Sequence, residues 1–137
     1  MLEVKREMEV AASAEAVWAV IGEFGALADW HPAATASSAE DVHGEVHRTI
    51  VVGDGARLVE KLENLDNSAH TYSYSIVEGP LPVKDYLSTL SVEGNDNGSV
   101  IHWSGRFNAN GAPDDQAKEV IGGIYDLGLN ALKKRLG

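Results

Sequence analysis

Residues 46–62 read VHRTIVVGDGARLVEKL, two runs of alternating polarity joined by a short glycine turn. Because side chains of a strand alternate between the two faces of a sheet, the first run has on one face Val46, Arg48, Ile50 and Val52. The glycines of Gly53-Asp54-Gly55 can take the positive φ angles that a three-residue hairpin loop with a bulge requires. The stretch therefore predicts a β-hairpin.

The loop length also sets the register of this hairpin. Pairing residue 52 with residue 56 places Arg48 directly opposite Glu60 on the face that holds Ile50 and Leu58. A register shifted by one residue would set the apolar row of one strand against the charged row of the other. The sequence thus predicts an arginine–carboxylate pair on an inward face.

An inward ion pair points to a site more than to stability. Removing two charges from water costs several kcal/mol each, and their attraction often only offsets that cost. The alternative is that this face is solvated, or that both heads extend outward past the edge of the sheet.

Size and composition narrow the class of protein. The 137 residues predict one domain, 1–137, with a single core. A formal charge of −10 repels phosphate backbones and anionic lipid surfaces, so we expect no nucleic-acid partner and no membrane insertion. The chain has no cysteine, and we expect it to be soluble, unprocessed and cytoplasmic.

Periodicity and turn residues predict the remaining elements. The first helix begins at Ser13 as N-cap, and the second ends before His31-Pro32 because proline disfavours the α region at the preceding residue. A final helix begins near Pro113 and runs to the C-terminus. Strands are expected at residues 2–11, 35–42, 46–52, 56–62, 70–76, 85–92 and 101–107. This order predicts an α+β fold in which a long helix covers an antiparallel sheet.

Aromatic residues are expected on the same inward face. If Leu65 pairs with Ala69, Tyr74 falls opposite Glu60 and Tyr72 falls opposite Leu62. The final helix carries an apolar stripe at helical spacing that consists of Ala117, Val120, Ile121, Ile124, Gly128, Ala131 and Leu132. Its glycines at 122, 123 and 128 indicate either close packing on the sheet or a thinned wall beside a cavity, and both readings stay open.

Four short segments carry a resemblance to a known family: WHPA at 30–33, GEVHR at 44–48, EKL at 60–62 and PVKDY at 82–86. With the order of elements, they resemble the polyketide cyclase/dehydrase branch of the START-like (SRPBCC, helix-grip, birch-pollen-allergen-type) superfamily. The resemblance implies a seven-stranded curved antiparallel sheet wrapped around a long C-terminal helix, with two short helices after strand 1. It also implies an internal hydrophobic cavity, but no common reaction.

The resemblance extends to Arg48 and Glu60, which are similar to the arginine and glutamate of lachrymatory factor synthase, whose proton transfer needs no cofactor. The plant abscisic acid receptors of this superfamily have a gate loop where this chain has Gly53-Asp54-Gly55. The loop lacks the gate's sequence, and whether it acts as a gate stays open.

Two functions are therefore expected. The first is binding of a small hydrophobic molecule, lipid-, polyketide- or sterol-like, with the Arg48–Glu60 pair at its polar end. The alternative is a cofactor-independent cyclase, dehydratase or isomerase in which Glu60 is the acid/base and Arg48 stabilises an oxyanion. The predicted ligand-binding residues are Trp30, Arg48, Glu60, Tyr72, Tyr74, Tyr86, Trp103, Phe107, Ile121 and Ile124.

The sequence also bears on a protein partner, on metal binding and on the oligomeric state. The apolar loop Leu81-Pro82-Val83 either closes the mouth of the pocket or contacts a partner protein, and the former is preferred. His31 either lines the pocket entrance or caps a bend. His43 and His47 lie four apart on a strand and do not form a helical ligand pair, so no metal or other cofactor is expected. The chain is expected to be a monomer or a homodimer, and neither the ligand's identity nor its transformation follows from the sequence.

Overall fold

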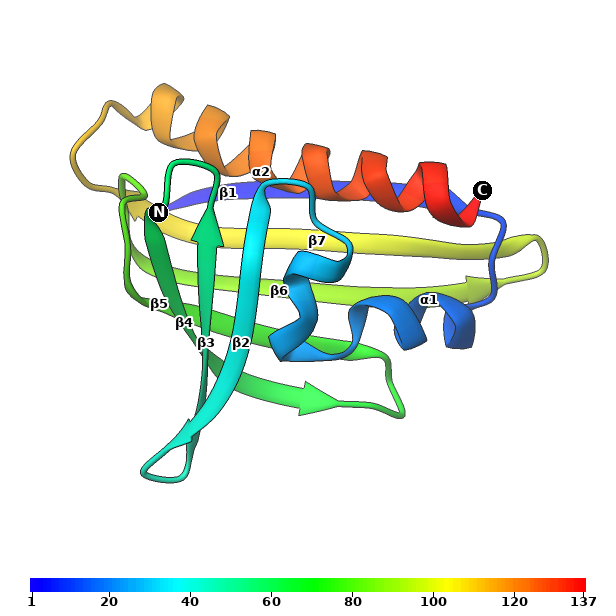
Figure 1. Cartoon of the computed structure of the whole chain (residues 1–137). Helices are drawn as coiled ribbons and strands as arrows, with labels where there is room; N and C mark the ends of the chain where they lie inside the picture. Colours follow the sequence, from blue (N-terminus) through cyan, green and yellow to red (C-terminus); the bar gives the residue numbers. More distant parts are fainter.

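The sheet and the long helix dominate the structure, a computed structural model that describes residues 1–137 (Figure 1). The helical elements are α1 (Ala14–Ile21), the 3-10 helix η1 (Phe24–Asp29) and α2 (Asp114–Leu136). The strands are β1 (Leu2–Val10), β2 (Ala34–Val42), β3 (Glu45–Val52), β4 (Arg57–Asp66), β5 (Thr71–Glu78), β6 (Val83–Asn95) and β7 (Gly98–Ala109). The expected element order is therefore confirmed.

All seven strands form one antiparallel sheet in the order β1-β7-β6-β5-β4-β3-β2. The sheet curves so strongly that β2 and β3 come round in front of β6 and β7, while α2 runs along the side of β1 and β7 (Figure 1). The short helices α1 and η1 lie in the opening of this curve, and η1 packs on β2. The predicted helix-grip architecture is confirmed.

The hairpin of β3 and β4 has the predicted register. Arg48 pairs with Glu60 and Ile50 pairs with Leu58. The Val52 N–H donates to the Ala56 carbonyl at 3.0 Å, and Gly55 has a φ of +89°, which explains the glycine in the loop.

The predicted register of β4 against β5 is wrong. Tyr74 lies opposite Leu62, and Ile76 lies opposite Glu60. The turn has four residues, 67–70, closed by the Asp66 carboxylate that accepts from two backbone N–H groups, and bulges interrupt the ladder near Glu60 and Leu62. Beside Glu60 the strand pairing differs from the prediction by two residues, and an even shift leaves Tyr72 and Tyr74 on the predicted face of the sheet. Both tyrosines are buried.

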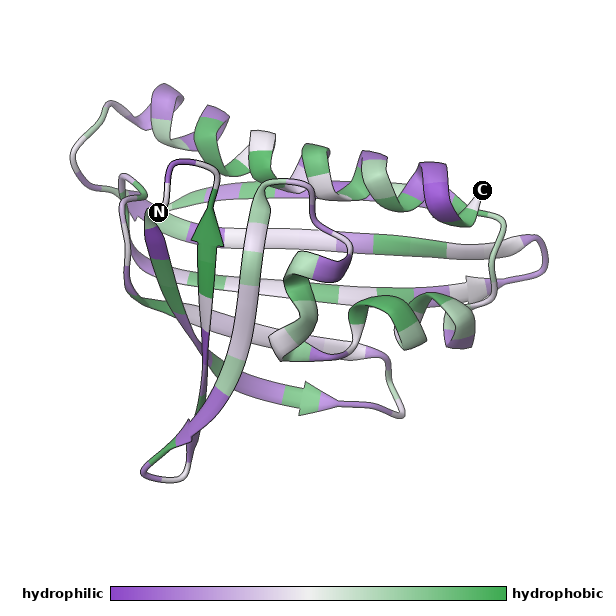
Figure 2. Cartoon of the chain, viewed as in Figure 1, coloured by the Kyte–Doolittle hydropathy of each residue, from purple (hydrophilic) through white to green (hydrophobic).

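The helix α2 begins after Pro113, as predicted, but its buried stripe is rotated from the expected one. Val120, Ile124 and Ala131 are only half-buried and flank the stripe. Tyr125 and Leu129, which the prediction omitted, are fully enclosed. The buried residues of the helix are Ala117, Ile121, Gly122, Tyr125, Gly128, Leu129 and Leu132, and Figure 2 shows the alternation of apolar and polar turns along it.

The helix glycines differ in what surrounds them. A methyl group at Gly128 would lie 2.7 Å from His31 Cδ2 and 2.8 Å from Trp103 Cζ3, which is too close for carbon atoms. A methyl group at Gly123 would meet nothing within 4 Å. Close packing therefore explains Gly128. A separate finding is that no helix of the chain is long and apolar enough to cross a membrane.

We expect Gly128→Ala to lower the free energy of unfolding by about 1–3 kcal/mol, because overpacking against two rings outweighs the better helix propensity of alanine. The matched control Gly123→Ala, on the same helix, should raise it by up to about 1 kcal/mol. Urea unfolding followed by circular dichroism measures both, and a stabilised Gly128→Ala variant would contradict the packing.

Candidate functional site

An apolar pocket of about 110 Å³ lies between the curved sheet and α2. Its deep end is buried and holds the Arg48–Glu60 pair, while its outer end reaches the half-exposed residues Ala33, Val52 and Leu81. The walls consist of Leu27, His31, Ala33, Ala34, Arg48, Ile50, Val52, Leu58, Glu60, Tyr74, Pro80, Leu81, Tyr86, Trp103 and Ile124. The pocket is thus lined mainly by apolar side chains, and its only charged side chains lie at the deep end.

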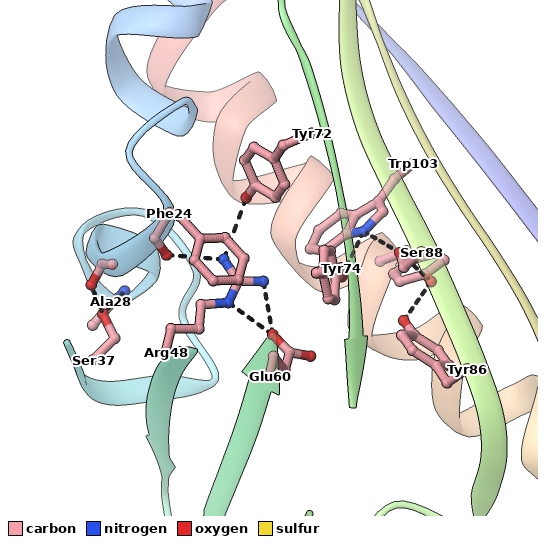
Figure 3. A network of polar contacts seen from close by, with 12 residues as sticks. Phe24, Ala28, Ser37, Arg48, Glu60, Tyr72, Tyr74, Tyr86, Ser88 and Trp103 are labelled. Carbon is pink, nitrogen blue, oxygen red and sulfur yellow. Dashed lines mark hydrogen bonds and ion pairs between the residues drawn. The ribbon is translucent and has the colours of Figure 1, made fainter. Parts of the chain in front are cut away.

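Arg48 and Glu60 form a direct ion pair in this deep end. The guanidinium Nε and Nη2 lie 2.8 Å and 2.7 Å from the same carboxylate oxygen, Glu60 Oε1 (Figure 3). The two residues are only 1% and 4% exposed. The predicted pair is therefore inward and buried, and the alternative of a solvated face is wrong.

The protein also satisfies the rest of the guanidinium. Its Nη1 donates to the Phe24 carbonyl at 3.0 Å and to Tyr72 Oη at 3.3 Å. The rings of Phe24 and Tyr74 lie 4.1 Å and 4.6 Å from its central carbon. Because arginine has five N–H donors, these contacts leave one N–H of Nη2 without a protein acceptor.

The carboxylate of Glu60, by contrast, is only half used. Both contacts from Arg48 end on Oε1, and Oε2 points away from the guanidinium in Figure 3. Burial raises the pKa of Glu60, while the charge of Arg48 and its hydrogen bond work to lower it. The other carboxylate oxygen is therefore a hydrogen-bond acceptor free for a further contact.

A chain of hydrogen bonds through Tyr86, Tyr125 and Ser88 runs through the core beside the pocket. In each of these bonds only one of the two groups can be the donor. Ser88 Oγ must donate to the Ser104 carbonyl at 2.9 Å, since a carbonyl only accepts. Tyr125 Oη must then donate to Ser88 Oγ at 2.8 Å, and Tyr86 Oη must donate to Tyr125 Oη. Tyr86 lines the pocket with its proton already used, so it offers only an acceptor.

The structure places six of the ten predicted ligand-binding residues on the pocket wall: Arg48, Glu60, Tyr74, Tyr86, Trp103 and Ile124. The other four, Trp30, Tyr72, Phe107 and Ile121, are buried but do not line it. Tyr72 lies behind the wall, bonded to Arg48, and Trp30 packs on His31 and Trp103. Phe107 and Ile121 are fully enclosed in the core.

Periodicity missed wall residues that come from connections between elements. Ala33 lies between η1 and β2, and Pro80 and Leu81 lie between β5 and β6. Leu81 forms part of the pocket's outer end, in agreement with the preferred reading of that loop. Ile50 and Leu58 share the face of Arg48 and Glu60, and that alternation was the available signal for them.

His31 is buried, lines the pocket and also closes the bend after η1. Its Nδ1 accepts from the Ala33 N–H at 3.1 Å, so its Nε2 carries the proton and donates to the Ile124 carbonyl at 2.8 Å. Burial lowers the pKa of His31 below its ordinary value of 6.5. The hydrogen bond to Ile124 acts to raise this pKa, and the charge of Arg48 makes a smaller contribution that lowers it. The neutral ring thus ties the mouth of the pocket to α2.

The chain matches the family described as polyketide cyclase/dehydrase and lipid transport over residues 1–137, and it belongs to that family. It is 30% identical over 113 residues to MLP-like protein 423 from Arabidopsis thaliana, covering 74% of this chain and 72% of that protein. The predicted membership in the START-like superfamily is confirmed.

Solved structures share this fold over nearly the whole chain. Protein XoxI from Bacillus cereus is 35% identical with a TM-score of 0.92, and the match covers 99% of this chain and 96% of that one. The Zhui aromatase/cyclase from Streptomyces sp. R1128 has a TM-score of 0.76 at 20% identity, covering 98% and 92%. The second likeness shows the fold alone.

Burial of His31 as a neutral ring makes the free energy of unfolding depend on pH. The folded protein favours the neutral ring, so the unfolded chain binds a proton more readily below pH 6.5. This contribution to stability is complete above pH 6.5 and is lost as the pH falls from there toward the folded-state pKa. We expect urea unfolding between pH 7.5 and 5.5 to show a loss of up to about 1.4 kcal/mol per pH unit that His31→Gln lacks. Equal losses in the two proteins would contradict this assignment.

Proposed function

We propose that this protein binds a small, mostly apolar molecule in the pocket, with the polar end of the ligand at the Arg48–Glu60 pair. The observation that carries the proposal is a buried carboxylate with one unpaired oxygen at the closed end of an apolar recess. This oxygen is not among the enclosed side-chain atoms that lack a partner, so it is accessible from the pocket, and a ligand that enters can donate a hydrogen bond to it. Membership in a lipid-transport and cyclase family supports ligand binding at the level of the class.

The pocket volume restricts the size of the ligand. An apolar cavity of about 150 Å³ in another protein holds one benzene ring. A pocket of about 110 Å³ is of the same order, so a single-ring molecule or a short branched chain fits it. A sterol or a long acyl chain, both within the sequence-based expectation, requires the walls to move apart.

A substitution at the outer end tests the proposal. We expect Ala33→Trp to abolish the chemical-shift changes that toluene causes in the amide NMR spectrum of the wild-type protein, because the indole fills the entrance. The matched control is Ala36→Trp, at an exposed position three residues further along, near the start of β2, that does not line the pocket. Absence of any toluene effect on the wild-type protein, or its survival in Ala33→Trp, would sink the proposed site.

Acid/base catalysis without a cofactor is the second candidate. The free oxygen of Glu60 and the raised pKa of its carboxyl favour it, because a general base needs an accessible lone pair and a pKa nearer neutrality. Arg48 retains a single N–H to stabilise an oxyanion, so its share in such a reaction is smaller than the sequence suggested.

The exchange of α-protons of cyclohexanone in D₂O measures this activity directly. If Glu60 acts as a base, the wild-type protein accelerates deuterium incorporation above the buffer rate, and Glu60→Gln loses about 10²-fold or more of that acceleration. Equal rates for the wild-type protein, the variant and buffer would leave binding as the only function of the pocket.

A further inference from the structure

The polar groups on the pocket wall differ sharply in what they still offer a ligand. His31 uses both ring nitrogens on backbone groups, and Trp103 Nε1 donates to Tyr74 Oη and Ser88 Oγ. Four of the five N–H groups of Arg48 are likewise bound to protein acceptors. Apart from one N–H of Arg48 and the hydroxyl proton of Tyr74, whose oxygen accepts from Trp103, the donors of the wall are therefore occupied.

The acceptors of the wall are not. Glu60 Oε2 has no protein partner, because both contacts from Arg48 fall on Oε1. Tyr86 Oη has given its proton to Tyr125, a direction fixed by the carbonyl of Ser104 at the end of the chain. Both residues line one pocket whose other residues are mostly apolar or aromatic.

From this asymmetry we infer that the pocket selects an uncharged, single-ring molecule that carries a hydrogen-bond donor, such as a phenol-type hydroxyl or a ring N–H, which it presents to Glu60. The inference rests on the proposed binding function and makes it specific. A ligand that only accepts, such as an aldehyde or ketone, finds one N–H of Arg48 and the hydroxyl of Tyr74, and leaves the carboxylate oxygen unpaired. A ligand carboxylate would in addition lie against the negative charge of Glu60 in an environment without water.

Four probes of similar size separate these chemistries: phenol, toluene, benzaldehyde and benzoate. The wild-type protein is titrated with each probe and followed by amide NMR at pH 8, where phenol stays neutral. We expect phenol to bind about 10-fold or more tightly than toluene, since a hydrogen bond to a buried charged acceptor is worth that factor. Benzaldehyde, which leaves the carboxylate oxygen unpaired, should bind less tightly than phenol, and benzoate should not bind.

The variant Glu60→Gln reverses the polarity of the site. Because Arg48 only donates, the amide oxygen of the new side chain must face the guanidinium, and its NH₂ group then takes the place of Oε2. We expect the variant to prefer benzaldehyde over phenol. Retention of the wild-type preference would overturn the inference.

Because Glu60→Gln leaves the buried guanidinium of Arg48 without its counter-charge, a second variant keeps the inference testable if the first one misfolds. Arg48→Met combined with Glu60→Leu replaces the pair by apolar groups, an exchange that buried ion pairs often tolerate. This double variant should bind toluene and phenol equally, and a persisting preference for phenol would overturn the inference.

The outcomes also separate the inference from the function on which it rests. If toluene, benzaldehyde or benzoate binds the wild-type protein as tightly as phenol or more tightly than phenol, donor selection is wrong while ligand binding stands. If none of the four probes binds, the proposed function fails and the inference fails with it.

Discussion

The buried contact between Arg48 and Glu60 constrains the rest of this structure. A guanidinium that is 1% exposed must have an acceptor for its N–H groups and a counter-charge, or its burial is too costly. The register of β3 on β4 supplies the carboxylate, the start of η1 supplies a carbonyl, and β5 supplies the Tyr72 hydroxyl. One side chain thus fixes three segments around the closed end of the pocket.

The same constraint was visible in the sequence because a hairpin is a local structure. The three-residue loop and the two-residue period of a strand together determine which residues face each other, and no distant contact is needed. The next hairpin obeys the same rules but could not be predicted in detail. Asp66 caps a turn of four residues, and bulges follow it, so the pairing of Tyr74 changed while its face did not.

The wall of the pocket was harder to predict than its floor. Strand periodicity identified Arg48, Glu60, Tyr74 and Tyr86, but loops have no period, and Ala33, Pro80 and Leu81 come from loops. The helix α2 posed a different problem, because its buried stripe includes the polar-ended Tyr125, whose hydroxyl is bound to Ser88 and Tyr86. A pattern that counts only aliphatic residues as inward therefore places the centre of such a stripe to one side of its true position.

The fold alone does not decide what such a pocket binds, since related sheets and helices enclose spaces of different size and polarity. Here large rings on the inward face, Phe24, Tyr74 and Trp103 among them, occupy volume that smaller side chains would leave to a ligand. What remains is a small recess in which most donors are bound to protein, while one oxygen of Glu60 has no protein partner. Because matching a buried polar atom discriminates far more strongly than filling apolar space, the unpaired oxygen of Glu60 governs selection there more than the shape of the walls does.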